Sequence, residues 1–151
     1  MVLGGLIQPL RFLFIERKNM AEFNIPKPGE ICWRELATKD LAKAIDFYSQ
    51  LFGWDLQQSK VTPMDYKEII IDGKAAGGMM QIDEKWGNDP PPSHWNNYIA
   101  VENADATAEK IKTEGGRVEV GPFDAPGVGR IAIAADPAGA PFAIIQFVAA
   151  S

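Results

Sequence analysis

The stretch that decides the fold is CWRELATKDLAKAIDFYSQLFGW, which runs from residue 32 to residue 54. Aromatic and aliphatic residues over 32–37 predict a short strand. Asp40 then stands where a helix cap is expected. Apolar residues follow it at spacings of three and four, which predicts an amphipathic helix. Gly53 ends this helix, because glycine commonly occupies the position just past a helix end.

The same pattern returns later in the chain. The interval from Asp40 to Asn103 equals the interval from Gly53 to Gly116. A strand-like run over 98–101 precedes Asn103, and an apolar stripe follows it. A strand, a cap, an apolar stripe and a terminal glycine therefore occur twice in the same register.

Three strand-like segments follow each predicted helix, separated by turn signals such as Asp72-Gly73. A single β-α-β-β-β unit leaves one face of its sheet uncovered, so two such units must share a core. We therefore predict an α+β fold with two βαβββ modules. The strand-like segments are 54–56, 66–71, 78–82, 118–120, 129–134 and 142–148.

The domain organisation follows from these modules. We predict a single domain over 29–150, built of modules 29–83 and 94–150, with a proline-rich linker over 84–93. Residues 1–28 are expected to form an N-terminal extension. A chain of 151 residues is long enough for one domain of this kind and too short for two ordinary ones.

The apolar start of the chain resembles a signal peptide poorly. Gln8, Pro9 and Arg11 interrupt the run, whereas a signal peptide needs an unbroken apolar stretch. The run is also too short to span a bilayer, which takes about 20 mostly apolar residues. We favour Met20 as the start of the native protein, with residues 1–19 as an extension that does not belong to it.

Composition limits the classes of partner. The chain is 46% hydrophobic, which is typical of a packed globular protein. Its net charge of −5 argues against nucleic acid and against anionic membranes as partners. A small neutral or cationic ligand fits better. Cys32 is the only cysteine, so an internal disulfide is excluded, and a reducing, cytoplasmic compartment is expected.

The motifs resemble those of a known family. WRELATKD at 33–40 and FYSQLFGW at 47–54 are similar to the opening module of the vicinal oxygen chelate superfamily, which includes glyoxalases, bleomycin resistance proteins and dioxygenases. DPAGA at 136–140, followed by a final strand, resembles the last hairpin of the same family. The resemblance covers about residues 29–148 and implies that the modules form a curved mixed-sheet cup. It is closest to glyoxalase-related members without an assigned role and weaker to lactoylglutathione lyases.

The usual metal ligands of the family are missing from this sequence. In metal-using members, the first and last strands of each module supply one carboxylate or imidazole each. His94 is the only histidine, and next to the Pro-rich loop it is expected to be solvated or to act as a cap. We therefore expect a cup with no metal and no cofactor. The positions that correspond to the ligands fall near Trp33, Asn96, Met79 and Ala143.

Strand alternation predicts which residues line the concave face of the cup. Small-molecule sites combine apolar and aromatic walls with a few polar groups that orient the ligand. Cys32 would point to the opposite, helix-packed face as a small apolar residue. The residues that we predict to bind a ligand are Trp33, Met79, Gln81, Trp95, Asn96, Tyr98 and Ala143, with Glu35 as the catalytic candidate.

Glu35 is the most informative of these residues, because a carboxylate in an apolar wall needs a donor, a cation or a proton. It could act as a general acid or base beside a carbonyl group, with Tyr98 or Asn96 donating to the developing oxyanion. Alternatively, it could form a salt bridge with Arg130 or Arg34 that holds two strands together.

A third alternative is that Glu35 attracts a cationic ligand, with Trp33, Trp95 and Tyr98 offering aromatic faces to it. Two hypotheses of function therefore remain open. The first is a protein that binds or sequesters a small molecule without a chemical step. The second is a metal-independent enzyme of the lyase or isomerase type that acts on a small carbonyl compound through Glu35. Free strand edges would also allow a homodimer.

Overall fold

The computed structural model describes residues 25–60, 65–125 and 129–147. Most of the predicted extension over 1–28 therefore lies outside the described residues. The chain divides into two compact units, of which unit 1 comprises 34–95 and unit 2 combines 25–33 with 96–147 among the described residues. Among these residues, no helix is both long and apolar enough to cross a membrane.

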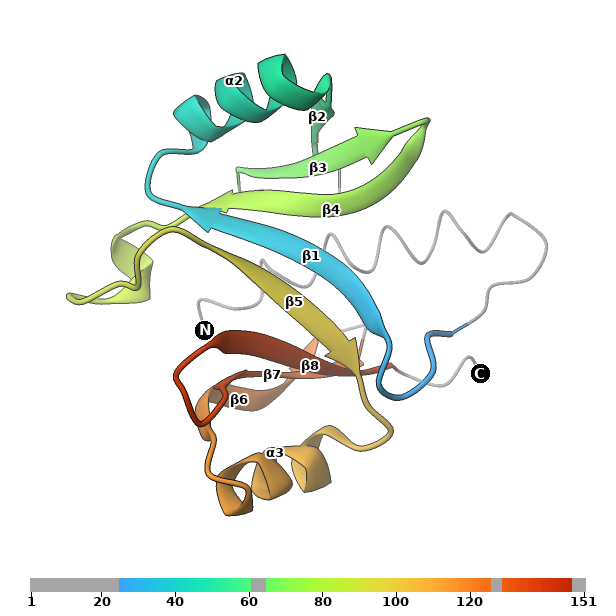
Figure 1. The fold of residues 1–151 in the computed structure, drawn as a ribbon, viewed down its shortest axis with the longest axis vertical. Coiled ribbons are helices and arrows are strands. Elements are labelled where there is room, and N and C mark those ends of the chain that lie inside the picture. The colour runs from blue at the N-terminus through green and yellow to red at the C-terminus, as the bar shows by residue number, and fades with distance from the viewer. Residues whose placement is uncertain (1–24, 61–64, 126–128, 148–151) are drawn as a thin grey trace. The chain divides into compact units, whose positions relative to one another are not determined.

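Unit 1 carries the first module, in which strands lie in the order β2-β3-β4-β1 (Figure 1). Strands β1 and β4 are parallel, and the other neighbours are antiparallel. The first three residues of β1 fall in unit 2. The elements of this module are β1 (Ile31–Thr38), α2 (Leu41–Phe52), β2 (Asp55–Gln58), β3 (Tyr66–Ile71) and β4 (Lys74–Gln81).

Unit 2 carries the second module, whose strands lie in the order β5-β8-β7-β6. Strands β5 and β8 are parallel, and the other neighbours are antiparallel. A short 3-10 helix, Glu84–Trp86, separates the modules along the chain, inside the predicted linker. The elements of the second module are β5 (His94–Ala100), α3 (Ala104–Thr113), β6 (Arg117–Ala125), β7 (Gly129–Ala135) and β8 (Pro141–Phe147).

The α+β fold with two βαβββ modules is thus confirmed, and the main differences from the prediction concern strand ends. Strand β5 begins at His94, well before the predicted strand over 98–101. Strand β6 continues to Ala125 instead of ending at residue 120. Its register with β7 shifts twice, between Val118 and Phe123. Such bulges let a strand continue through residues that read as turn signals in the sequence.

The predicted helix caps are confirmed. The side chain of Asp40 accepts a hydrogen bond from the Lys43 N–H at 3.0 Å, and the side chain of Asn103 accepts one from the Ala106 N–H at 2.9 Å. Gly53 ends α2 with a φ of 67°, in the left-handed region that glycine adopts without strain. Local sequence chemistry therefore sets the helix limits.

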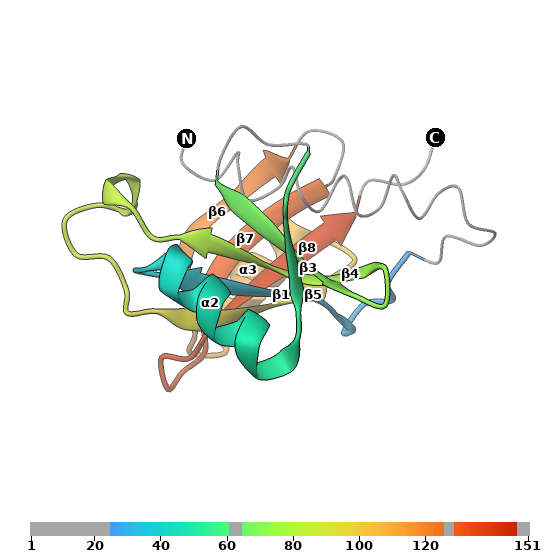
Figure 2. The same ribbon diagram turned by 90° about the horizontal axis from the view of Figure 1, so that it is seen from above.

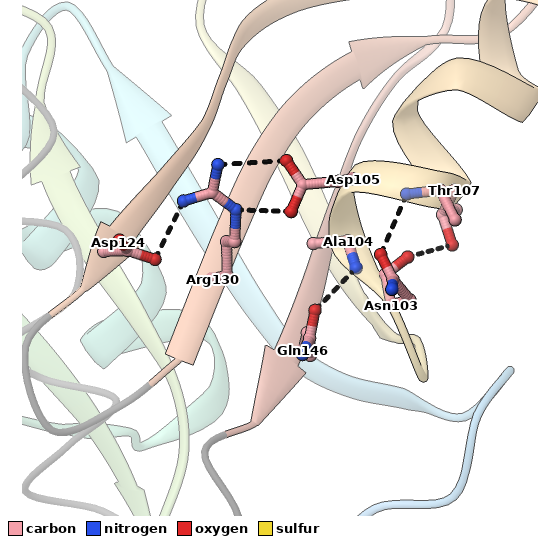
Figure 3. A network of polar contacts seen from close by, with 8 residues as sticks. Asn103, Ala104, Asp105, Thr107, Asp124, Arg130 and Gln146 are labelled. Atoms are coloured by element: carbon pink, nitrogen blue, oxygen red, sulfur yellow. Dashed lines mark hydrogen bonds and ion pairs between the residues drawn. The ribbon is translucent and has the colours of Figure 1, made fainter.

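A second contact at each helix start was not predicted. The Gln81 Oε1 accepts a hydrogen bond from the Leu41 N–H at 2.9 Å, and the Gln146 Oε1 accepts one from the Ala104 N–H at 2.8 Å (Figure 3). Both glutamines lie at the end of the last strand of their module. Each therefore satisfies an N–H of the first helical turn that has no acceptor within the helix, and attaches the helix to that strand.

Each helix covers one face of its own sheet. Figure 2 shows α2 in front of the strands of unit 1, and its Leu41 packs in one cluster with Leu36, Ile69 and Met79. In unit 2, Ala104 of α3 packs with Ala132 and Ile144. Since side chains alternate along a strand, the residues between these positions point to the face that the helix does not cover.

An aromatic cluster of unit 1 joins Tyr48 of α2 to Trp54 and Trp95. The rings of Tyr48 and Trp54 are stacked with centroids 5.5 Å apart, and the ring of Trp95 meets Tyr48 edge-on at 5.5 Å. The Trp95 Nε1–H donates a hydrogen bond to the Tyr48 Oη at 3.1 Å. Phe47 and Phe52 beside this cluster are 58% and 56% exposed, so α2 presents an apolar surface as well as a buried one.

Arg130 of β7 ties the start of α3 to β6 (Figure 3). Its Nε and Nη2 donate to the two carboxylate oxygens of Asp105 at 2.7 and 3.0 Å, and its Nη1 donates to Asp124 at 2.8 Å. The hydrogen bond from Arg130 lowers the pKa of Asp105 below its usual value of 3.8. The two carboxylates raise the pKa of Arg130 in turn, through the same hydrogen bonds.

Replacing either glutamine should destabilise the protein, because a helix N–H loses its acceptor. We expect Gln146→Ala to cost about 1 kcal/mol of unfolding free energy. Gln81→Ala should cost up to about 2 kcal/mol, since its Nε2 also donates to the carbonyls of Lys39 and Ile82. Urea unfolding measures both. The exposed Gln57→Ala is the control and should change stability by less than about 0.5 kcal/mol; equal effects at all three sites would contradict the prediction.

The Arg130–Asp105 contact should make the free energy of unfolding depend on pH in the acidic range. Because folding lowers the pKa of Asp105, the contribution is complete above its usual value of 3.8 and is lost as the pH falls through the lower folded-state pKa. Asp105→Asn should therefore be less stable than the wild type at neutral pH, and the difference should shrink below pH 3.8. Denaturant unfolding across this range measures it, and a difference independent of pH would refute it.

Candidate functional site

The candidate site in unit 1 is a row of residues that crosses three strands on the face opposite α2. Glu35 of β1 and Glu68 of β3 both lie beside Gly78 of β4 in the strand register. Glu35 is 3% exposed and Glu68 is 5% exposed. Two carboxyl side chains are thus buried on one sheet face with a glycine between them.

Tyr66 of β3 lies on the same sheet face, beside Met80 in the register. Its hydroxyl donates a hydrogen bond to the Glu35 Oε2 at 2.8 Å, and the ring is 1% exposed. A side chain at Gly78 would overlap the Tyr66 hydroxyl and ring. The missing Cβ at Gly78 therefore leaves the space through which Tyr66 of β3 reaches across β4 to Glu35 of β1.

This arrangement gives the Glu35 carboxyl a fixed orientation in a water-poor setting. A buried carboxylate is tolerated only when donors replace its lost hydration, and the Tyr66 hydroxyl is one such donor. A carboxyl group held by a phenol at 2.8 Å lies within the range for proton transfer partners. The pair can therefore bind a polar or cationic group of a ligand, or exchange a proton with it.

The predicted strand face is wrong for Met79 and Gln81. Met79 packs against α2, and Gln81 caps the same helix. The prediction matched Met79 to Ala143, but the two capping glutamines show that the true interval between the last strands is longer by a single position. Such a slip moves every side chain of a strand to the other face. Gly78, which pairs with Glu35 as Ala143 pairs with Tyr98, takes the predicted place.

The alternation predicted for the second module agrees with the structure of unit 2. Asn96 and Tyr98 of β5 are buried, whereas their neighbours Trp95 and Asn97 are exposed. Tyr98 pairs in the register with Ala143, which is fully buried. Asn96, Tyr98 and Ala143 therefore share the face opposite α3. Trp95 lies on the other side of its strand, in the aromatic cluster of unit 1.

The remaining predicted residues have mostly structural contacts. Trp33 is buried at 2% exposure. The Cys32 thiol is partly buried and donates to the Tyr98 carbonyl at 3.4 Å. The His94 Nδ1 lies 2.8 Å from the Pro92 carbonyl oxygen, which suits the loop-capping role expected for it. Arg130, one of the salt-bridge partners considered for Glu35, binds Asp105 and Asp124.

The donor groups do not fit the metal centre of the metal-using vicinal oxygen chelate proteins. Within 25–60, 65–125 and 129–147, no three side chains among His, Cys, Asp and Glu gather closely enough to hold a metal ion. The face opposite α2 in unit 1 carries two carboxyl groups, those of Glu35 and Glu68, whereas the corresponding face of unit 2 carries Tyr98 and Ala143. Tyr98 and Ala143 are not ordinary ligands of hard or borderline cations, so these positions of unit 2 supply no carboxylate or imidazole.

A family profile decides the relationship. The profile of the Glyoxalase/Bleomycin resistance protein/Dioxygenase superfamily matches residues 30–144. The chain belongs to this superfamily. The matched range includes both βαβββ modules up to the middle of β8, so membership of the superfamily and the observed fold agree.

Relatives of known name extend this comparison. The chain is 40% identical over 128 residues to the anthracycline biosynthesis protein DnrV of Streptomyces peucetius, in a match that covers 78% of the chain and 46% of the relative. The anthracycline biosynthesis protein DauV of a Streptomyces species is 39% identical over the same length. The chain thus spans about half the length of these relatives.

Solved structures with the same fold are distant in sequence. A hypothetical protein from Bacillus halodurans superimposes with a TM-score of 0.55 at 13% identity, covering 83% of this chain and 99% of that one. A variant of homoprotocatechuate 2,3-dioxygenase from B. fuscum gives a TM-score of 0.52 at 18% identity, covering 82% of this chain and 33% of the other. At these identities the similarity shows the fold alone.

Sequence reasoning missed Tyr66, Glu68 and Gly78 as site residues. All three lie in segments that were predicted as strands. The sequence offered one signal, namely that Glu68 follows the aromatic Tyr66 by two positions and that a glycine pair occurs at 77–78. Only the strand register and the Tyr66 hydrogen bond show that these residues meet Glu35 on one sheet face.

Removing the Tyr66 hydroxyl should destabilise the fold. Tyr66→Phe deprives a buried carboxyl group of a donor, and we expect a loss of about 1–3 kcal/mol in unfolding free energy. Tyr48→Phe is the matched control, since its hydroxyl accepts a bond from Trp95 in an exposed setting; it should cost less than about 0.5 kcal/mol. Thermal and urea unfolding measure both variants, and equal losses would argue against a special role for the Tyr66–Glu35 bond.

Proposed function

We propose that this chain binds a small organic compound on the face of unit 1 opposite α2 and acts as a small-molecule binding or sequestering protein. The observation that carries the proposal is the buried hydrogen bond from Tyr66 to Glu35. It lies among apolar neighbours such as Met80 and Ala37. An apolar wall with a few oriented polar groups is the usual composition of a small-molecule site.

The chemistry of the site and the names of the relatives suggest the same class of ligand. The relatives at 40% and 39% identity are named for anthracycline biosynthesis, which makes fused aromatic compounds the first probes to test. Glu35 would attract an amine or another cationic substituent on such a compound. The net charge of −5 favours cationic over anionic ligands.

A second candidate function rests on the same hydrogen bond. Glu35 could serve as a general acid or base on a small carbonyl compound, taking a proton from the carbon beside the carbonyl group and returning it. Tyr66, at 2.8 Å from the carboxyl oxygen, would position Glu35 for this transfer. Such an enzyme would be a lyase or isomerase that needs neither a metal nor another cofactor. A cytoplasmic location and a homodimer remain predictions.

Glu35→Gln separates the two functions. Gln can still accept the Tyr66 hydrogen bond, so the fold should persist. A binding protein should keep its affinity for neutral aromatic compounds and lose about tenfold for amine-bearing ones. An acid–base enzyme should still bind but lose turnover by roughly a hundredfold to ten-thousandfold.

Fluorescence titration measures affinity, and exchange of the carbon-bound proton in deuterium oxide, followed by NMR, measures turnover. Asp46→Asn on the exposed side of α2 is the control for the change in charge. Unchanged affinity for amines together with unchanged exchange in Glu35→Gln would exclude both roles of Glu35.

A further inference from the structure

Asn96 in unit 2 carries a buried acceptor for which the described residues supply no donor. The residue is 6% exposed. Within the described part of the chain, its Oδ1 has no hydrogen-bond partner. A buried polar atom in this state costs folding free energy, and native proteins contain few of them. The atom therefore calls for a partner that is not part of the described chain.

The surroundings of Asn96 restrict what this partner is. The face that it shares with Tyr98 continues into the buried Ala143 and Ile145 of β8. A metal ion needs several oxygen ligands, and aliphatic side chains supply none. A single neutral amide oxygen on an apolar face instead suits one O–H or N–H donor of an otherwise apolar molecule.

We propose that the Asn96 Oδ1 is a specificity-determining acceptor for a neutral small molecule that carries a hydroxyl or N–H group on an apolar skeleton. The inference rests on the proposed function in one respect, namely that the chain binds small organic compounds. It adds the class of the ligand and a site residue on unit 2. It does not depend on any role of Glu35.

This acceptor discriminates against analogues that lack the donor. A ligand with a hydroxyl group satisfies the Oδ1 on binding, whereas its methyl ether buries the oxygen without a partner. Sites built around a hydrogen bond reject analogues that leave their polar groups unpaired more strongly than apolar pockets reject analogues of different size. Stability and binding should therefore respond to Asn96 in opposite directions.

The test uses two probes and two variants of the full chain. The probes are an anthraquinone with a hydroxyl group remote from both carbonyls and the methyl ether of the same compound. Asn96→Leu replaces the amide by an apolar side chain of similar size. Asn97→Leu changes the exposed neighbour on the other face of β5 and serves as the control. Calorimetric titration gives the affinities, and thermal unfolding without ligand gives the Tm.

We expect the wild type and Asn97→Leu to bind the hydroxyl probe about tenfold more tightly than its ether. Asn96→Leu should bind both probes equally while its Tm stays the same or rises, because the unpaired acceptor is gone.

Equal affinities of the wild type for the two probes would overturn the inference and leave the proposed function standing. A water molecule bound to the Oδ1 would produce this result. A clear fall in the Tm of Asn96→Leu would show that the amide is structural and would also overturn it. Binding of neither probe to the wild type would reject both proposals for this class of compound.

Discussion

The bond between a glutamine at the end of each last strand and the first turn of each helix sets the geometry on which the rest of each module depends. Gln81 holds the start of α2 and Gln146 holds the start of α3, at 2.9 and 2.8 Å. A helix attached in this way can cover only one face of its sheet. Because side chains alternate along a strand, the attachment also decides which residues of β4 and β8 point to the opposite face.

The face opposite α2 holds buried polar groups that a purely structural sheet does not need. Burying Glu35 costs free energy, which the bond from Tyr66 offsets in part. The close approach depends on Gly78, whose missing side chain makes room for the Tyr66 ring. Three residues from three strands thus maintain one oriented carboxyl group. Polar groups kept in this way at a cost in stability are typical of functional sites.

Sequence reasoning identified most of the fold because local chemistry determines it. The caps Asp40 and Asn103, and the glycine at 53, are read directly from residue type and spacing. The strand face of Glu35, Asn96 and Tyr98 was also predicted, because the first strand of each module lies at a fixed distance before its helix cap. The last strands could not be placed as well, because bulges and turns of unequal length precede them. An error of a single position there placed Met79 where Gly78 lies.

The contacts of Glu35 could not be predicted from the sequence. Tyr66 stands 31 residues away along the chain, and only the register of three strands brings it within bonding distance. No local pattern distinguishes a strand tyrosine that packs from one that donates to a buried carboxyl group. The partners of Arg130 were missed for the same reason, since Asp105 and Asp124 belong to different elements.

The aromatic cluster of unit 1 gives this module an optical signature. Tyr48 and Trp54 are stacked at 5.5 Å, and Trp95 meets Trp54 edge-on at 6.2 Å. Rings held this closely at fixed angles couple their electronic transitions, and the resulting near-ultraviolet circular dichroism disappears when side-chain packing loosens. Tyr48 belongs to α2, and Trp54 follows the Gly53 that ends this helix. The signal therefore reports how firmly the helix packs on its sheet, even when the far-ultraviolet spectrum is unchanged.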